Sequence, residues 1–212
     1  METIYYISQG ITVGDHLKNI SMACEAGCRL VQFRLKDIDF ETYQKAAIKA
    51  LEICRTYNAT LLINDNVTIA KEIGADGVHI GKSDMNPNDA RQIIGNKIIG
   101  GTANTLEDCL RLIEQKVNYI GLGPLRYTTT KSELSPILGI DGYKEILGKL
   151  RALKKAIPIV AIGGIQAEDF ETLFGIGISS VAVSGLLTDK PEHELKTIIN
   201  QAKIKPLMAF NL

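Results

Sequence analysis

Residues 30–64, LVQFRLKDIDFETYQKAAIKALEICRTYNATLLIN, contain the pattern that decides the fold. Two short, largely apolar runs, Leu30–Leu35 and Thr60–Asn64, flank a longer segment, Phe40–Tyr57, with the apolar spacing of an amphipathic helix. Consecutive parallel strands need a crossover connection, and that connection is usually a helix. The stretch therefore predicts a strand–helix–strand unit whose two strands are parallel.

The same alternation runs along the whole chain. The other strand-like runs are Ile4–Ile7, Gly77–Ile80, Lys97–Gly101, Tyr119–Gly123, Ile159–Ile162 and Val181–Val183. Helical spacing returns in Leu106–Lys116 and Tyr143–Lys155. Eight units of about 26 residues each predict an α/β fold, a (β/α)8 TIM barrel. The alternative is a doubly wound sheet, but residues 8–14 lack the glycine-rich first turn that such sheets carry. We expect a single domain over residues 1–212, with a C-terminal tail at 203–212.

Composition limits the class of partner. The chain has 24 Lys and Arg against 24 Asp and Glu, so its formal net charge is zero. A neutral chain argues against nucleic acid as the main partner and leaves small anionic ligands open. The most apolar segment, residues 157–165, is far shorter than the roughly 20 residues that a membrane span needs. We therefore expect small-molecule substrates and no membrane partner, and a homo-oligomer is compatible with the sequence.

Four cysteines, Cys24, Cys28, Cys54 and Cys109, lie in segments expected to be helical. Cys24 and Cys28 are four residues apart, so they could share a helical face and form a metal or disulfide pair. The favoured interpretation is that all four are reduced thiols of a cytoplasmic protein, because disulfides are rare in that compartment. The N-terminus has no secretory signal pattern, which points to the same location.

In barrels of this type the chemistry lies at the carboxyl ends of the strands. In the run from Leu30, the apolar residues at 31, 33 and 35 share one face, and Gln32, Arg34 and Lys36 share the other. We expect the polar face to point into the barrel near its mouth. The two cations could pair with carboxylates in an internal salt-bridge network. They could instead form a cationic cup for an anionic ligand, with Gln32 available for polar recognition.

Two carboxylates follow the next two strands. Asp65 comes directly after Thr60–Asn64, and Asp84 follows Gly77–Ile80. Neighbouring strands lie about 4.8 Å apart, so both side chains could reach one site. Such a site would suit Mg²⁺, which binds carboxylates, water and phosphate oxygens. Alternatively, Asp84 caps the helix that follows it. For His79, within its apolar strand, we expect a hydrogen-bonded core residue rather than an acid or base.

Two further segments suggest anion binding. The loop of residues 125–140 is long for its position and contains the run Thr128, Thr129, Thr130 and Lys131, which could cradle a phosphate or simply be solvated. Glycine ends the last two strands, in Gly163-Gly164 and Ser184-Gly185. Barrel enzymes often bind phosphate at these two loops through backbone N–H groups, although glycine also serves tight turns. The mouth would then have two separate anion sites.

The motifs VQFRLK, LLINDN, GADGVHIGKSD, YIGLGPLRYTTTK and IPIVAIGGI occur in this order across about residues 28–187. Together they resemble the thiamine-phosphate synthase family, whose members join a pyrimidine diphosphate to a thiazole phosphate. The resemblance implies a transferase that forms thiamine monophosphate and pyrophosphate, assisted by Mg²⁺, through dissociative loss of pyrophosphate.

The resemblance also implies residue roles. Arg34, Lys36, Asn64 and Lys131 would hold the diphosphate, with Gln32 at the pyrimidine edge and Asp65 and Asp84 on Mg²⁺. Thr128 and Thr130, with Gly164, Ser184 and Gly185, would hold the thiazole phosphate, and Thr129 lies in the same run. Thr102 stands where the family usually has Ser, and we group it with Arg34, Lys36 and Lys131 as catalytic.

Three alternatives use the same barrel. The related thiazole tautomerase has a His in the loop after strand five, where this chain has Asn104. A sugar-phosphate isomerase would need fewer cations than the second strand supplies. A phosphate-ligand sensor without catalysis is the alternative outside the enzymes.

Overall fold

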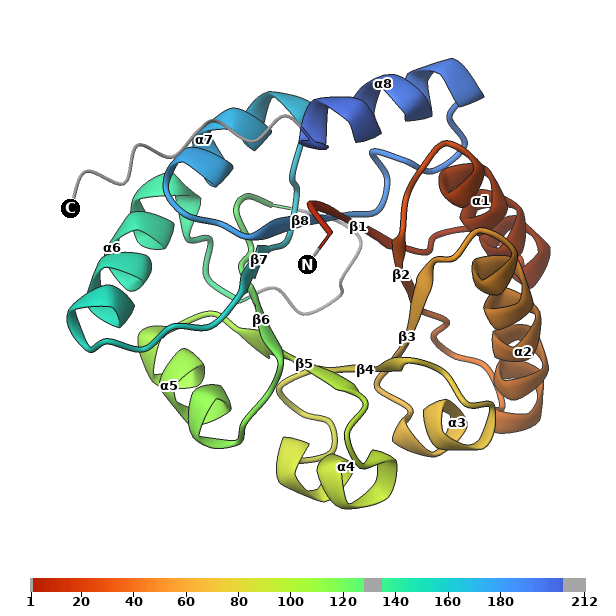
Figure 1. Ribbon diagram of the computed structural model, residues 1–212, viewed down its shortest axis with the longest axis horizontal. Helices are drawn as coiled ribbons and strands as arrows, with labels where there is room; N and C mark the ends of the chain where they lie inside the picture. Colours follow the sequence, from red (N-terminus) through yellow and green to blue (C-terminus); the bar gives the residue numbers. More distant parts are fainter. Residues whose placement is uncertain (1, 128–134, 204–212) are drawn as a thin grey trace.

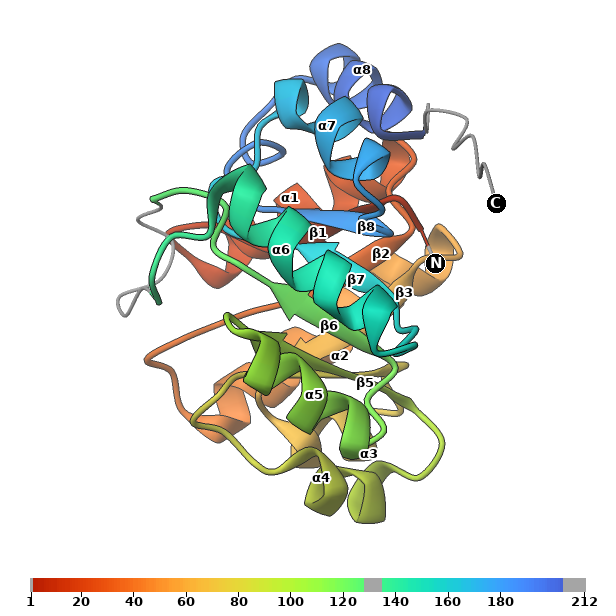
Figure 2. The ribbon, with the colours of Figure 1, turned by 90° about the vertical axis from the view of Figure 1, so that its left-hand side faces the viewer.

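The structure is a computed structural model of the 212-residue chain that describes residues 2–127 and 135–203. Its strands form a closed parallel barrel in which each strand pairs with its neighbours in sequence and β8 pairs with β1 (Figure 1). Helices surround the barrel on the outside, as the side view in Figure 2 also shows. The predicted (β/α)8 TIM barrel is confirmed.

The strands are β1 (Ile4–Ile7), β2 (Leu30–Phe33), β3 (Thr60–Asn64), β4 (Gly77–Ile80), β5 (Ile98–Ala103), β6 (Tyr119–Leu122), β7 (Ile159–Ala161) and β8 (Ser180–Val183). The helices are α1 (Val13–Glu25), α2 (Phe40–Thr56), α3 (Val67–Glu72), α4 (Pro87–Ile94), α5 (Leu106–Glu114), α6 (Gly139–Ala152), α7 (Phe170–Gly175) and α8 (Glu192–Lys203), with a short 3₁₀ helix, η1, at Ala167–Asp169. Residues 204–212, most of the predicted tail, lie outside the described part of the chain.

Several predicted boundaries shift. Strand β2 ends at Phe33 rather than Leu35, and the N–H of Arg34 donates to the Ser8 hydroxyl at 3.0 Å. Strand β5 continues past Gly101 to Ala103, because β6 extends alongside it. Helix α6 begins at Gly139 and ends at Ala152, so it starts before the predicted Tyr143 and stops before Lys155.

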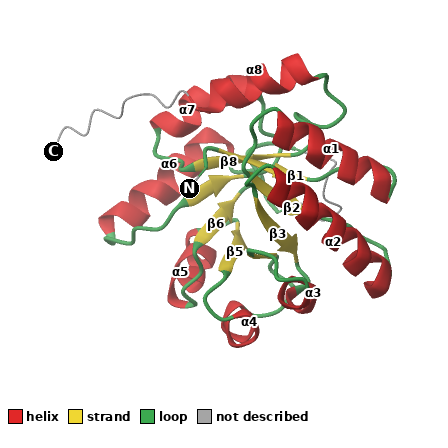
Figure 3. Ribbon diagram, turned by 45° about the vertical axis from the view of Figure 1, so that its right-hand side comes forward, coloured by secondary structure: helices red, strands yellow, loops and turns green. Residues whose placement is uncertain are grey.

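Two apolar cores result from the alternation of side chains along the strands. The barrel interior is filled by Tyr5, Leu30, Leu62, Tyr119, Val160 and Ala182. The larger core lies between strands and helices and includes Val31 and Phe33, whereas Gln32 points inward to bond Tyr5. Figure 3 shows the strands inside the ring of helices that covers this outer core. The predicted division of β2 is confirmed for Val31 and Phe33, which face outward, and Gln32, which faces inward, whereas Arg34 and Lys36 lie beyond the end of the strand.

Two of the alternatives that the sequence left open are excluded. Asn86, not Asp84, caps α4, and its side chain accepts from the N–H of Asn88. Cys28 lies beyond the end of α1, so it does not share a helical face with Cys24. The four cysteines are free, as expected, and all four are buried. None of the helices in the described ranges is long and apolar enough to cross a membrane.

Candidate active site

A cavity of about 810 Å³ opens at the carboxyl ends of the strands. The sequence-predicted residues that line it are Gln32, Arg34, Lys36, Asn64, Asp65, Asp84, Thr102, Gly164, Ser184 and Gly185. The run from Thr128 to Lys131 lies outside the described residues. Closure of the barrel therefore gathers ten of the predicted residues, from β2 through β8, around one space.

The cationic side of the cavity comes from the loop after β2. The Lys36 ammonium forms an ion pair with the Asp65 carboxylate. Thus the salt-bridge interpretation holds for Lys36. The Arg34 guanidinium has no hydrogen bond or ion pair with the described residues, although it lines the cavity. A cation that faces a cavity without a carboxylate partner is available for an anionic ligand.

Asp65 is held in an unusual backbone conformation at the end of β3. Its φ angle is 61°, in the left-handed region that non-glycine residues rarely adopt, and its N–H donates to the His79 carbonyl at 2.8 Å. The Asn64 amide donates to Asp65 Oδ2 at 2.5 Å. Together with Lys36, these contacts fix the carboxylate at the rim.

Asp84 approaches the same point from the loop after β4. Its Oδ2 accepts from the Gly81 N–H at 2.8 Å, and a Cβ on Gly81 would lie only 2.6 Å from that oxygen. Burial and the adjacent Asp65 carboxyl raise the pKa of Asp84 above its usual range. Burial would also raise the pKa of Asp65, but hydrogen bonds from Asp84 and Lys36 outweigh it and lower that pKa. The pair is therefore two carboxyl groups in contact, one of which retains its proton more readily.

This pair suits a divalent cation. Within residues 2–127 and 135–203, no group of three or more His, Cys, Asp and Glu side chains could hold a metal. Mg²⁺ does not need such a cage, because it binds through one or two carboxylates and completes its shell with water and phosphate oxygens. A cation between Asp65 and Asp84 would remove the repulsion that raises the Asp84 pKa. The residues fit the predicted Mg²⁺ site.

The opposite wall presents backbone N–H groups, beside Lys190, whose ammonium pairs with Glu194. Gly163 and Gly164 have φ angles of 85° and 72°, and a Cβ on Gly164 would lie 2.4 Å from Cγ of Arg126. No acceptor among the described residues takes the N–H groups of Gly164, Gly185 or Leu186. Unpaired N–H groups facing a cavity form an anion-binding concavity.

An ion pair holds the first of these loops. The Arg126 guanidinium donates to both carboxylate oxygens of Asp169, at 2.6 and 2.7 Å, and to the Gly164 carbonyl at 2.6 Å. The loop after β6 is thereby fixed to the loop after β7. No local sequence pattern predicts this pair, because the two residues are 43 positions apart.

The floor of the cavity is formed by buried polar residues that no motif predicted. Tyr5 and Tyr119 meet in the barrel interior, with hydroxyl oxygens 3.0 Å apart. His79 bonds Tyr119 through Nδ1 at 2.8 Å and Thr102 through Nε2 at 2.9 Å, so the expected hydrogen-bonded core histidine is confirmed. Tyrosine at inward-facing strand positions was the available signal, since a buried hydroxyl needs a partner.

Neighbouring loops are tied together behind the site. Asn104 is buried, and its amide donates to the carbonyls of Gly123 and Pro136, both at 2.8 Å. Asp108 accepts from the Asn104 N–H at 3.0 Å and forms an ion pair with Lys82 in the loop after β4. Asn104 therefore has a structural role in this chain.

Comparison with known proteins identifies the relatives of this barrel. The family model described as thiamine monophosphate synthase matches residues 4–187. The chain belongs to this family. Over 200 residues it is 49% identical to the thiamine-phosphate synthase of Flavobacterium psychrophilum, which covers 93% of this chain and 97% of the relative. The corresponding protein of Flavobacterium johnsoniae is 47% identical over 196 residues, with 91% of each chain covered.

A solved structure agrees with this assignment. The thiamine phosphate pyrophosphorylase of Pyrococcus furiosus superposes with a TM-score of 0.80 at 25% identity, over 94% of this chain and 96% of that one. Membership in the family places the chain among the transferases of thiamine biosynthesis. The resemblance inferred from the sequence motifs is confirmed.

Proposed function

We propose that the protein condenses 4-amino-2-methyl-5-hydroxymethylpyrimidine diphosphate with thiazole phosphate, giving thiamine monophosphate and pyrophosphate. One observation carries the proposal: the cavity has two chemically different anion-binding walls. Arg34 and the carboxylate pair lie on one side, and the unpaired N–H groups of Gly164 and Gly185 lie on the other. A reaction between a diphosphate and a monophosphate requires both walls in one space.

Each wall then has a role. Arg34, Lys36, Asn64 and Thr102 would hold the diphosphate, joined by Lys131 from the loop after β6. Gln32, buried at the floor, would contact the pyrimidine edge. The backbone at Gly164, Ser184 and Gly185 would hold the thiazole phosphate, joined by Thr128, Thr129 and Thr130. These assignments combine the cavity lining with the family resemblance.

Asp65 and Asp84 would hold Mg²⁺, which when bound neutralises charge on the phosphate oxygens. The remaining work falls to the chain's own cations. Lys36 already contacts Asp65, so it lies within reach of any phosphate that joins the same site. The backbone N–H of Arg34 donates to the Ser8 hydroxyl, which fixes the backbone at this position. The Arg34 guanidinium has no carboxylate partner among the described residues, so no ion pair has to break before it binds an anion.

In the proposed reaction the bond between the pyrimidine methylene carbon and the diphosphate oxygen breaks, and the oxygen keeps the electron pair. The lone pair of the thiazole nitrogen then forms the new carbon–nitrogen bond. Negative charge grows on the leaving pyrophosphate, and preorganised cations stabilise it without reorganisation of solvent. No protein nucleophile is needed.

The test is to mix the protein with both substrates, each alone and together, with Mg²⁺ or with EDTA, and to measure pyrophosphate. We expect release only with both substrates and Mg²⁺. Tight binding of either substrate with no release would identify a sensor and overturn the proposal. Isomerisation of the thiazole compound without pyrophosphate would identify a tautomerase. We also propose a cytoplasmic location, which cell fractionation tests. Light scattering tests whether the chain forms the homo-oligomer with which the sequence is compatible.

A further inference from the structure

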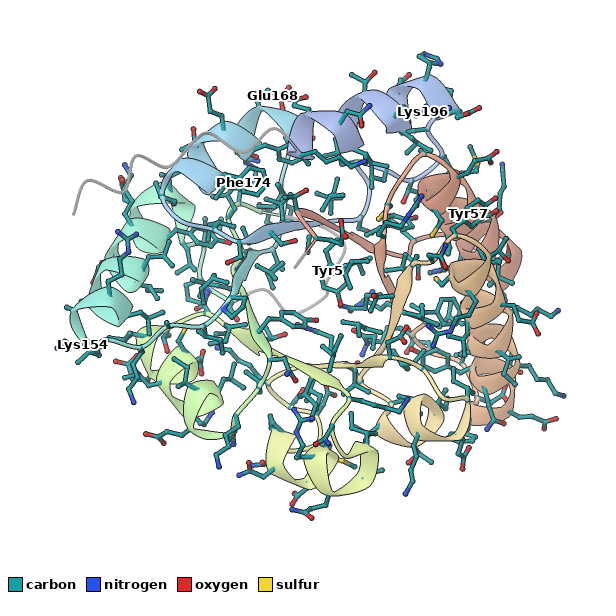
Figure 4. The ribbon with its side chains drawn as sticks, viewed as in Figure 1. Tyr5, Tyr57, Lys154, Glu168, Phe174 and Lys196 are labelled. Atoms are coloured by element: carbon teal, nitrogen blue, oxygen red, sulfur yellow. The ribbon has the colours of Figure 1, made fainter. Side chains whose placement is uncertain are left out.

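Five polar side chains form one continuous hydrogen-bonded chain across the barrel interior, beneath the cavity. In order they are Gln32, Tyr5, Tyr119, His79 and Thr102. The successive distances are 2.8, 3.0, 2.8 and 2.9 Å. The residues belong to β2, β1, β6, β4 and β5, and Figure 4 shows Tyr5 in the middle of the barrel. Both ends of this polar chain line the cavity.

A glycine makes the middle of the polar chain possible. Gly100 of β5 pairs with His79 of β4 on one side and with Tyr119 of β6 on the other. Because Gly100 has no side chain, the two rings stack over it with centroids 5.6 Å apart. A Cβ at this position would lie 2.0 Å from Cζ of Tyr119. The contact between His79 and Tyr119 is thus built into three adjacent strands.

Counting hydrogen atoms gives the polar chain a direction. The Gln32 amide Nε2 donates to the Tyr5 hydroxyl oxygen, so the single hydroxyl hydrogen of Tyr5 goes to Tyr119. The hydroxyl hydrogen of Tyr119 then goes to His79 Nδ1. Nε2 of a neutral His79 carries the ring hydrogen and donates it to the Thr102 hydroxyl oxygen. Burial raises the pKa of both tyrosines, which keeps both hydroxyl hydrogens in place.

This direction determines what each end offers to a ligand. The Thr102 hydroxyl, having accepted from His79, has its own hydrogen left to donate into the cavity. At the other end, Gln32 Oε1 accepts no hydrogen bond from the described residues, and the side chain lines the cavity. Turning the Gln32 amide over would reverse every bond, and Thr102 would then donate to His79. A phosphate oxygen only accepts hydrogen bonds, so an anion at Thr102 favours the first direction.

We propose that Tyr5, Tyr119 and His79 are positioning residues that couple the two ends: they hold Oε1 of Gln32 and the hydroxyl hydrogen of Thr102 toward the cavity. The site then selects a ring that presents an N–H donor to Gln32 and carries an anionic group that reaches Thr102. An amino-substituted ring satisfies both ends. Its oxo analogue places an acceptor against the acceptor of Gln32 and is rejected. The inference rests on the proposed function and names what selects its pyrimidine substrate.

The first test needs no ligand. Ring-nitrogen NMR spectra of ¹⁵N-histidine-labelled protein report which nitrogen of His79 carries hydrogen, and comparison with a His79→Gln sample assigns its signals among the 3 histidines. We expect hydrogen on Nε2 and a bare Nδ1. Hydrogen on Nδ1, alone or on both nitrogens, would overturn the proposed direction.

The second test removes one hydroxyl from the middle of the polar chain. Binding of 4-amino-2-methyl-5-hydroxymethylpyrimidine diphosphate and of its 4-oxo analogue is measured by calorimetry for wild type and Tyr119→Phe. We expect wild type to prefer the amino compound by at least about tenfold, and the variant to lose most of that preference. The matched control is Tyr143→Phe: Tyr143 is also fully buried, and its hydroxyl donates to the Leu122 carbonyl outside the polar chain.

The outcomes separate this inference from the proposed function. An unchanged preference in Tyr119→Phe, with normal turnover by wild type, would refute the coupling and leave the function standing. Wild type that prefers the amino compound but releases no pyrophosphate would refute the function and leave the coupling standing. If Tyr119→Phe does not fold, Tyr5→Phe interrupts the same polar chain one bond earlier and gives the same comparison.

Discussion

The two ends of the barrel each have a cavity of similar size and very different chemistry. The cavity at the carboxyl ends measures about 810 Å³, and the one at the amino ends about 600 Å³. Tyr119 lines both, so its ring separates them. The amino-end cavity is otherwise lined by Glu2, Thr3, Leu30, Thr60, Leu62, Ile98, Asn118, Pro158 and Lys203. Volume alone therefore does not distinguish a binding site from a gap at the end of a barrel.

The two cavities differ in the kind of polar group that faces them. At the amino end, the Asn118 amide oxygen accepts from the Ile99 N–H and from Arg91. Asp76 in the same region accepts from the Leu61 N–H and from Arg55. At the carboxyl end, the Arg34 guanidinium and several backbone N–H groups face the cavity with no such partner among the described residues. The carboxyl groups of Asp65 and Asp84, which contact each other, face it as well. Unsatisfied polar groups are costly unless a ligand completes them, which marks the carboxyl end as the functional one.

The largest expected effect comes from the carboxylates. Asp65→Asn and Asp84→Asn should each lower pyrophosphate release by about 100-fold or more, because the metal loses an anionic ligand. Glu2→Gln removes a carboxylate from the amino-end cavity and should leave the rate unchanged. The measurement is rate against Mg²⁺ concentration. A wild-type Mg²⁺ response in both aspartate variants would place the metal elsewhere.

Cations come next. Lys36→Ala and Lys131→Ala should each lower turnover at saturating substrate by at least about tenfold, because each removes a positive charge that stabilises the leaving pyrophosphate. Lys203→Ala, at the amino-end cavity, is the control and should turn over normally. Wild-type rates in Lys131→Ala would remove the loop lysine from the mechanism.

A substitution of Gly164 probes the backbone wall. Gly164→Ala adds a Cβ 2.4 Å from Cγ of Arg126 at a φ angle of 72°. We expect the KM for thiazole phosphate to rise about tenfold, because the substitution displaces the backbone N–H groups that would hold its phosphate. Binding of the pyrimidine diphosphate should change little, since the wall formed by Arg34 and the carboxyl pair is unaltered. Gly74→Ala is the matched control, because Gly74 has a similar φ angle of 73°, has open space around it and lies near the amino end of the barrel. It should lose stability and keep both KM values. A rise in both KM values for Gly164→Ala would argue against two separate walls.

The smallest effect concerns stability and its dependence on pH. Burial opposes ionisation of Asp108, but Lys82, the Asn104 N–H and Arg111 outweigh it and lower its pKa to about 2 from 3.8. A pKa lowered by folding adds stability above the unfolded-state pKa, and that stability is lost as pH falls from about 4 toward 2. Asp108→Asn should cost about 1 kcal/mol at pH 7, allowing for solvent screening.

Urea unfolding at several pH values measures this cost. We expect the difference between Asp108→Asn and wild type to shrink as pH approaches 2. A difference as large at pH 2 as at pH 7 would show that lost packing, not charge, is responsible. Asp76→Asn, at the amino end, is the comparison, and it should destabilise the fold without changing KM. Asp108→Asn should also raise KM a few-fold, because Asp108 links Asn104 to Lys82 in the loop after β4.

Much of the site could be predicted from local sequence. The period-two alternation of β2 places Gln32 inward whatever the details of the fold, and Asp65 follows β3 directly. The ends of strands were harder to predict. The end of β2 depends on the hydroxyl of Ser8, which directly follows β1, and the length of β5 depends on its pairing with β6. The alternative in which Asp84 caps the following helix is excluded for a similar reason. Asn86 is closer to the helix, and Asp84 is drawn toward Gly81 and Asp65.

By itself the sequence determined the succession of strands and helices, the inward face of each strand and the residue types at each carboxyl end, because these depend on periodicity and neighbours in the chain. Only the tertiary structure decided which groups meet. Tyr5 and Tyr119 are 114 positions apart and touch only because the barrel closes. Closure also gathers the Arg34 guanidinium and the backbone N–H groups of Gly164 and Gly185 around one cavity. Hydrogen bonding is a property of pairs in space, so the chemistry of the site became readable only once the eight strands formed a ring.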